Sequence, residues 1–172
     1  MQTVILAAGK GTRMKDLTVE IPKPMLKVAN KNLLEHKLDL LPDIVTEVII
    51  VIGYKGEKIK EYFGDMYKNK KIVYVEQTET LGTGHALWQV QHLIQDKFLV
   101  MMGDDIYSKH SIDNAIKHPF TMTVTKTPGF KTAGNVVTND QGFLQSIDFD
   151  REGVLPYVHM DIGLYSLSKE IF

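Results

Sequence analysis

Three short segments contain the residue types best suited to phosphate chemistry. Residues 7 to 13 read Ala-Ala-Gly-Lys-Gly-Thr-Arg, residues 22 to 24 read Pro-Lys-Pro, and residues 103 to 105 read Gly-Asp-Asp. Small residues leave the backbone free to turn its N–H groups toward a polyanion, and arginine and lysine add positive charge. Aspartate offers the hard oxygen ligands that magnesium prefers. Together these residue types predict a site for a phosphorylated ligand.

The glycine-containing loop at residues 7 to 13 fits neither of two common phosphate-binding signatures. A dinucleotide fingerprint needs a small residue where Met14 stands, and an acidic residue near the end of the second strand, where Ile52 stands. A Walker loop needs Gly-Lys-Ser/Thr, but Gly11 is followed by Thr12. A different way of binding phosphate is therefore indicated.

Two features of the basic residues support that interpretation. The chain has 18 lysines but only two arginines, Arg13 and Arg151, so the placement of Arg13 in this loop favours its bidentate guanidinium over mere positive charge. An ordinary solvated arginine is the alternative. Pro22 and Pro24 fix the backbone on both sides of Lys23, which lowers the entropy lost when the ammonium group is aimed at a ligand.

The elements that must position these residues follow from the apolar pattern. Apolar runs predict buried strands at residues 3–6, 47–52, 71–75 and 98–102, and helical spacing predicts helices after Asn32, at 56–63 and at 83–94. This alternation predicts a three-layer α/β/α, Rossmann-like fold with an open, mixed and mostly parallel sheet. Asp104 would then stand at the carboxyl edge of the sheet, where such folds bind ligands, although aspartate also favours turns and helix caps.

After Pro119 the predicted elements are short strands and no longer alternate with helices. Short strands are predicted at 120–125, 136–138, 144–149 and 162–167, separated by glycine, asparagine and aspartate turns, and they should extend the sheet as a second wall of the cleft. Ser168 is a good N-cap followed by Lys-Glu-Ile-Phe, so a helix is expected to begin where the sequence stops. We therefore expect a C-terminally truncated chain.

Length and composition narrow the class of protein. A chain of 172 residues with 44% hydrophobic content suits one packed domain. The net charge of -1 argues against nucleic acid or an anionic membrane as partner. Cysteine is absent, which fits a reducing compartment, and the apolar run near the N-terminus is too short to span a membrane. We expect a cytoplasmic location.

The same segments carry a resemblance to a known family. The stretch LAAGKGTRMKDLTVEIPKPMLKVANKNLLEH, residues 6–36, resembles the opening signature of the sugar-1-phosphate nucleotidylyltransferases. EQTETLGTGHAL at 76–87 resembles their base-recognition segment, and MGDD at 102–105 resembles their metal segment. The resemblance weakens after Lys126. It implies a single domain over 1–172, with a nucleotide-binding half (1–118) and the beginning of a sugar-binding half (119–172).

The resemblance also implies a reaction and a set of site residues. A nucleoside triphosphate, with UTP or dTTP favoured, would react with a sugar 1-phosphate to give nucleotide sugar and pyrophosphate. Arg13 and Lys23 would be catalytic, and Asp104 would bind the cofactor Mg²⁺. The implied nucleotide-binding residues are Leu6, Ala7, Ala8, Gly9, Gly11, Thr12, Gln77, Gly82 and Thr83. Without the resemblance, residues 77 to 83 could equally be a polar loop, and His85 is assigned no chemistry.

The sugar side of the resemblance is less regular. Gly134 and Asp161 are the implied sugar-binding residues, although many relatives have asparagine where Asp161 stands. Relatives also carry Glu-Lys-Pro where this chain reads DFDREG at 148–153, so Asp148 and Asp150 are the candidates to replace the glutamate. A second metal ligand of the family would lie beyond Phe172.

Two other functions stay open from the sequence. One is a module of the same fold that senses nucleotides without turnover. The other is a cytidylyltransferase acting on a non-sugar phosphate such as phosphocholine. The resemblance of LGTGHAL to uridylyltransferases acting on N-acetylglucosamine 1-phosphate favours hexosamine-like substrates. Homo-oligomer formation is left open.

Overall fold

The apolar runs of the sequence form the middle of one sheet. The computed structural model describes residues 1–79, 81–128, 134–149 and 156–172. The sheet has the strand order β5-β6-β4-β1-β7-β11-β8. Neighbours among β6, β4, β1 and β7 run parallel, whereas β5 and β11 run antiparallel to the strands beside them. The strands are β1 (Gln2–Ala7), β4 (Glu47–Ile52), β5 (Met66–Tyr67), β6 (Lys70–Glu76), β7 (Phe98–Met102), β8 (Thr121–Pro128) and β11 (Tyr157–Leu167).

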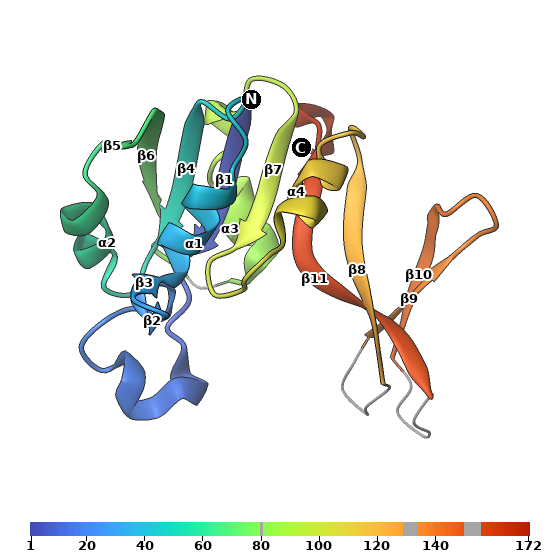
Figure 1. Ribbon diagram of the computed structural model, residues 1–172, viewed down its shortest axis with the longest axis horizontal. Coiled ribbons are helices and arrows are strands. Elements are labelled where there is room, and N and C mark those ends of the chain that lie inside the picture. Colours follow the sequence, from blue (N-terminus) through green and yellow to red (C-terminus); the bar gives the residue numbers. More distant parts are fainter. Residues whose placement is uncertain (80, 129–133, 150–155) are drawn as a thin grey trace.

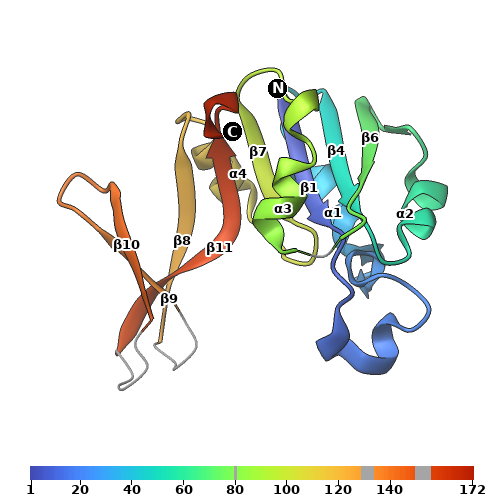
Figure 2. The same cartoon turned by 180° about the vertical axis from the view of Figure 1, so that it is seen from behind.

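Alternating side chains of the central strands supply two separate cores. Val4 packs on one face and Ile5 on the other, and both are fully buried. Helices α1 (Leu33–Leu40), α2 (Gly56–Phe63) and α4 (Lys109–Ala115) cover the Ile5 face, and α3 (Thr83–Trp88) covers the Val4 face (Figures 1 and 2). The predicted three-layer α/β/α architecture with a mixed, mostly parallel sheet is therefore confirmed.

The helix predicted over 83–94 divides into two parts. It is α-helical only as far as Trp88, and a 3₁₀ turn, η3 (Gln91–Leu93), follows. The backbone hydrogen bonds tighten to a three-residue spacing, as in the bond from Leu93 N to Val90 O at 2.9 Å. Val90 and Ile94 nevertheless stay buried, so the apolar spacing is kept while the hydrogen-bond pattern changes.

The second half only partly follows its prediction. β8 and β11 extend the sheet as expected, but β9 (Gly134–Thr138) and β10 (Leu144–Phe149) form a separate antiparallel ribbon that projects away from it (Figure 1). β11 also begins at Tyr157, earlier than predicted, because it continues past the sheet alongside β8. α4, capped by Ser108, was not predicted, and Ser168 caps only a 3₁₀ turn, η4 (Lys169–Ile171).

α1 begins with a complete capping box. The side chain of Asn32 accepts a hydrogen bond from Glu35 N, and the carboxylate of Glu35 accepts one from Asn32 N, each at 2.8 Å. A cap of this kind stabilises a helix by about 1 kcal/mol. The short hairpin of β2 (Lys27–Val28) and β3 (Lys31–Asn32) joins this cap to the Pro-Lys-Pro segment. The capping box therefore helps to fix where that segment meets the sheet.

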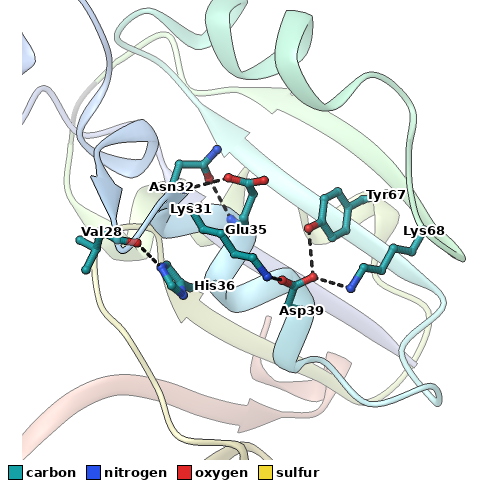
Figure 3. A network of polar contacts seen from close by, with 8 residues as sticks. All are labelled: Val28, Lys31, Asn32, Glu35, His36, Asp39, Tyr67 and Lys68. Carbon is teal, nitrogen blue, oxygen red and sulfur yellow. Dashed lines mark hydrogen bonds and ion pairs between the residues drawn. The ribbon is translucent and has the colours of Figure 1, made fainter.

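A carboxylate on α1 ties the same hairpin to the sheet edge (Figure 3). Asp39 accepts hydrogen bonds from the ammonium groups of Lys31 and Lys68, both at 2.5 Å, and from the Tyr67 hydroxyl at 3.0 Å. Burial raises the pKa of Asp39, but the three donors outweigh it and lower that pKa to about 2.

No helix in the described part of the chain is long and apolar enough to cross a membrane.

Candidate active site

A cavity of about 600 Å³ opens at the carboxyl edge of the parallel strands. It brings together residues from the first loop, the Pro-Lys-Pro segment, the β6–α3 connection and the turn after β7. Every residue that the sequence predicts for catalysis, nucleotide binding or metal binding lines it: Leu6, Ala7, Ala8, Gly9, Gly11, Thr12, Arg13, Lys23, Gln77, Gly82, Thr83 and Asp104. The individual roles of these residues stay predictions.

The turn that carries Asp104 lies directly against the end of β1. Gly103 N donates a hydrogen bond to the carbonyl oxygen of Leu6 at 2.8 Å. A Cβ on Gly103 would lie 2.7 Å from that oxygen and 3.0 Å from Ala7 Cα, so a larger residue would push the two segments apart. Gly103 thereby holds Asp104 beside the glycine-containing loop.

The same loop packs against the lysine between the two prolines. Gly11 has a φ of 64°, and a Cβ there would lie 3.2 Å from Lys23 Cβ. The Pro-Lys-Pro turn is closed by a hydrogen bond from Met25 N to Pro22 O at 2.8 Å. Arg13 follows in the 3₁₀ segment η1 (Thr12–Thr18), is exposed, and takes part in no ion pair among the described residues. Its guanidinium group is therefore available to a ligand.

Lys23 and Asp104 both line the cavity and form an ion pair with each other. The ammonium group of Lys23 donates to Asp104 Oδ2, and the two side chains keep 28% and 38% of their surface exposed. Both groups are thus accessible to a ligand. A phosphate would compete for the lysine and a divalent cation would compete for the carboxylate.

A buried lysine that was not predicted to contribute lies behind this pair. Lys37 on α1 is 1% exposed and donates hydrogen bonds to the carbonyl oxygens of Leu33 and Gly103, both at 3.0 Å. Burial lowers its pKa to about 8, although the charges of Asp104 and Asp105 act in the opposite direction. A lysine at an apolar position of a helix was the available signal, because such residues are rarely buried without a partner.

The acidic character of this edge extends toward β11. Partial burial and the charge of Asp104 raise the pKa of Asp105, and the charge of Asp161 contributes in the same direction. Asp161 accepts hydrogen bonds from the Tyr165 hydroxyl and from Gly163 N, the latter at 2.8 Å. It does not line the cavity.

The other predicted sugar-binding residues lie elsewhere. Gly134 is the first residue of β9 and pairs with Phe149, and Asp148 on β10 pairs with Asn135, so both stand on the projecting ribbon. Asp150 and Arg151 lie outside the described residues. The structure thus gathers the predicted nucleotide residues at one cavity, whereas Gly134, Asp148 and Asp161 lie outside the lining of that cavity.

Gln77 has a more constrained side chain than the sequence suggests. It is 7% exposed, and its Nε2 donates to the carbonyl oxygen of Gly82 at 3.2 Å and lies 3.1 Å from His85 Nδ1. The amide nitrogen is thereby occupied within the protein. His85, which was assigned no chemistry, is in direct contact with a residue of the cavity wall.

Comparison with known proteins decides the family. The nucleotidyl transferase family model matches residues 2–132, which is more than half of the chain. The chain belongs to the nucleotidyl transferase family. The matched segment of this nucleotidyl transferase chain includes the lining of the cavity from Leu6 to Asp104.

Several named relatives share the whole length of the chain. The bifunctional protein GlmU of Methanococcus maripaludis is 35% identical over 173 residues, covering 100% of this chain and 41% of the relative. UTP–glucose-1-phosphate uridylyltransferase AglF of Haloferax volcanii is 33% identical and covers 100% and 74%. The crystal structure of HddC from Yersinia pseudotuberculosis complexed with GMP-PN is 27% identical, with a TM-score of 0.72, and covers 99% of this chain and 77% of HddC. The chain spans about two fifths of the length of the GlmU relative.

Proposed function

We propose that this chain carries the nucleotidyl-transfer centre of a sugar-1-phosphate nucleotidyltransferase, with UTP or dTTP as the preferred triphosphate. The observation that carries the proposal is the meeting of Arg13, Lys23, Gln77 and Asp104 at one cavity. A nucleotide requires cations for its phosphates and a polar side chain for its base, and its metal ion requires a carboxylate. Their common location supports one function for all four residues.

The reaction joins two anions. An oxygen of the sugar 1-phosphate attacks the α-phosphorus of the triphosphate, a new P–O bond forms, and the bond from that phosphorus to the bridging α–β oxygen breaks. Pyrophosphate leaves with the electron pair. Each pair of unit charges about 4 Å apart costs roughly 4 kcal/mol at an effective dielectric constant of about 20. Positive charge is therefore the main requirement of the site.

The chain's own cations meet that requirement at different points. Arg13 stands on the exposed η1 segment at the mouth of the loop, where its planar guanidinium can hold two oxygens of the departing pyrophosphate. Lys23 exchanges Asp104 for a phosphate oxygen near the attacking group. The backbone N–H groups of the Ala8–Thr12 loop surround the remaining phosphate charge. These contacts position the reactants and stabilise charge as the bond to pyrophosphate breaks.

The donor set fits a magnesium ion that is shared with the substrate. No cluster of three or more His, Cys, Asp or Glu side chains suited to a metal occurs among the residues the structure describes. Asp104 can supply one carboxylate, and magnesium commonly takes one or two carboxylates together with substrate phosphates and water. When bound, the ion supplies additional charge neutralisation at the phosphate oxygens.

The names of the relatives support a nucleotide and a sugar phosphate while differing in the base. AglF is named for UTP and glucose 1-phosphate, whereas HddC was crystallised with a guanine nucleotide analogue. The resemblance of residues 76–87 to the family's base-recognition segment favours a pyrimidine. UTP and dTTP are therefore the triphosphates proposed, and the sugar is left to measurement.

The test is a substrate panel. The purified chain is incubated with magnesium, each nucleoside triphosphate and a set of sugar 1-phosphates that includes glucose and N-acetylglucosamine 1-phosphate, and pyrophosphate release is measured. Phosphocholine with CTP is included as a competing acceptor. Pyrophosphate release with UTP or dTTP and a sugar 1-phosphate is expected.

Two results would overturn this proposal. Nucleotide binding without turnover across the panel would favour a sensing module. Turnover with CTP and phosphocholine alone would assign the site to a non-sugar acceptor.

A further inference from the structure

Three side chains, those of Gln77, His85 and Gln89, contact one another in a row that begins at the cavity and ends at the C-cap of α3. Gln77 Nε2 lies 3.2 Å from Gly82 O and 3.1 Å from His85 Nδ1, and Gln89 Nε2 lies 2.9 Å from His85 Nε2. His85 and Gln89 are four residues apart, so one helical turn brings their side chains together. Of these three residues, Gln77 is the one that lines the cavity.

The Gly82 carbonyl fixes the direction of both hydrogen bonds of the Gln77 amide nitrogen. A backbone carbonyl oxygen only accepts, so the atom of Gln77 that faces Gly82 O is its nitrogen. The second hydrogen of that nitrogen points to His85 Nδ1, which must accept it. A neutral imidazole has one acceptor nitrogen, so His85 Nε2 carries the proton. The Gln89 amide, whose Nε2 is placed 2.9 Å from His85 Nε2, must then be turned by 180° so that its oxygen accepts.

This arrangement leaves Gln77 with one function toward a ligand. Both hydrogens of its amide are engaged, and its carbonyl oxygen is bonded to no group among the described residues. Gln77 therefore meets the cavity as a hydrogen-bond acceptor only.

Building on the proposed function, we propose that His85 is a positioning residue that sets base selectivity by fixing the Gln77 amide as an acceptor. Uracil and thymine present N3–H, and guanine presents N1–H, so each can donate to the Gln77 oxygen. Cytosine N3 and adenine N1 carry a lone pair at the corresponding position, which the oxygen repels. A polar group left unpaired or opposed in a closed site discriminates strongly, and we expect a preference of about 100-fold or more.

His85 acts through Gln77 and not on the reacting atoms, so its variants should change binding more than turnover. His85→Leu removes the hydrogen-bond acceptor and leaves the Gln77 amide free to rotate by 180°. His85→Asn places an amide oxygen where Nδ1 stands and can accept the same hydrogen bond. His92→Leu is the matched control, because His92 is an exposed residue of η3 outside the cavity lining.

The experiment measures binding of UMP, dTMP, GMP, CMP and AMP to the intact chain and its variants by titration calorimetry, alongside kcat and KM for any active triphosphate. The wild type and His92→Leu should prefer the keto bases. His85→Leu should lower that preference at least 10-fold and raise KM with little change in kcat, and His85→Asn should restore most of it.

The binding measurement separates this inference from the proposed function. Absence of pyrophosphate release would count against the transferase activity while the mononucleotide preference still reports on His85. An unchanged preference in His85→Leu, a wild type that binds CMP or AMP as tightly as the keto nucleotides, or a His85→Asn variant no better than His85→Leu would each overturn the role of His85.

Discussion

The ammonium group of Lys37 lies 3.0 Å from the carbonyl oxygen of Gly103, one residue before Asp104. A buried cation on α1 thus holds the backbone of the turn that presents the proposed metal ligand. The second bond, to Leu33 O, lies within α1 itself. The position of Asp104 therefore depends on a helix that the chain forms some seventy residues earlier.

Lys37→Met should make stability depend differently on pH. The pKa of Lys37 is about 8 in the folded chain, below its ordinary 10.5, so between these values the unfolded chain binds a proton that the folded chain has released. The wild type therefore gains stability from Lys37 as pH rises from about 8 to 10.5, by up to about 3 kcal/mol, whereas the variant does not. Urea unfolding of both proteins at pH 7 and pH 10.5 measures this. A difference that stays constant with pH would contradict it.

Asp39→Asn should weaken the attachment of the β2–β3 hairpin. Because donors lower the pKa of Asp39 to about 2, its stabilisation is present above about pH 4 and is lost as pH falls toward 2. The lysines are half exposed, so a loss of about 1 kcal/mol or less is expected at pH 7. Thermal unfolding from pH 7 to pH 2.5 should show the difference shrinking. The control Asp43→Asn, at an exposed position, should change little.

Arg13→Lys should reduce turnover by about 100-fold while leaving the fold intact, because the charge is kept but the bidentate contact is lost. Steady-state kinetics with the best substrate pair and circular dichroism test this. Lys15→Met, in the same η1 segment but outside the cavity lining, should retain near-normal turnover. Near-normal turnover in Arg13→Lys would refute its role.

Lys23→Met should bind a divalent cation more tightly than the wild type. In the free protein the ammonium group of Lys23 occupies Asp104, so removing it exposes the carboxylate. Titration with Mn²⁺ followed by electron paramagnetic resonance should show a severalfold gain for Lys23→Met and a loss for Asp104→Asn, while turnover falls in both. Equal Mn²⁺ affinity in the two variants would rule out competition between Lys23 and the ion.

The central sheet and the cavity lining were predictable for the same reason. Residues 48–52 and 98–102 are unbroken apolar runs followed by glycine, and in parallel strands such ends meet at one edge. Arg13 and Lys23 stood out through residue type and backbone restriction. Each of these signals lies within a short stretch of sequence and does not depend on contacts with distant segments.

The parts that were missed depend on contacts between distant segments. The function of Lys37 follows from the Gly103 carbonyl, and that of His85 from the rotamer of Gln77, which no pattern within one helix encodes. The ribbon of β9 and β10 reads as ordinary alternating strands, so nothing in its residues shows that it leaves the sheet. The change from α-helix to 3₁₀ turn after Trp88 kept its apolar spacing and was likewise invisible.

The flanking of β1 by β4 and β7 has a consequence for how the molecule is made. β1 is synthesised before both of its neighbours, and its end packs so closely against Gly103 that a Cβ there would meet Leu6 and Ala7. Pairing across such sequence separations is slow, because a long chain must close before the contact stabilises it. The glycine-containing loop is thus synthesised before the strand that carries the Gly-Asp-Asp turn, yet it cannot take its final shape until that strand has docked.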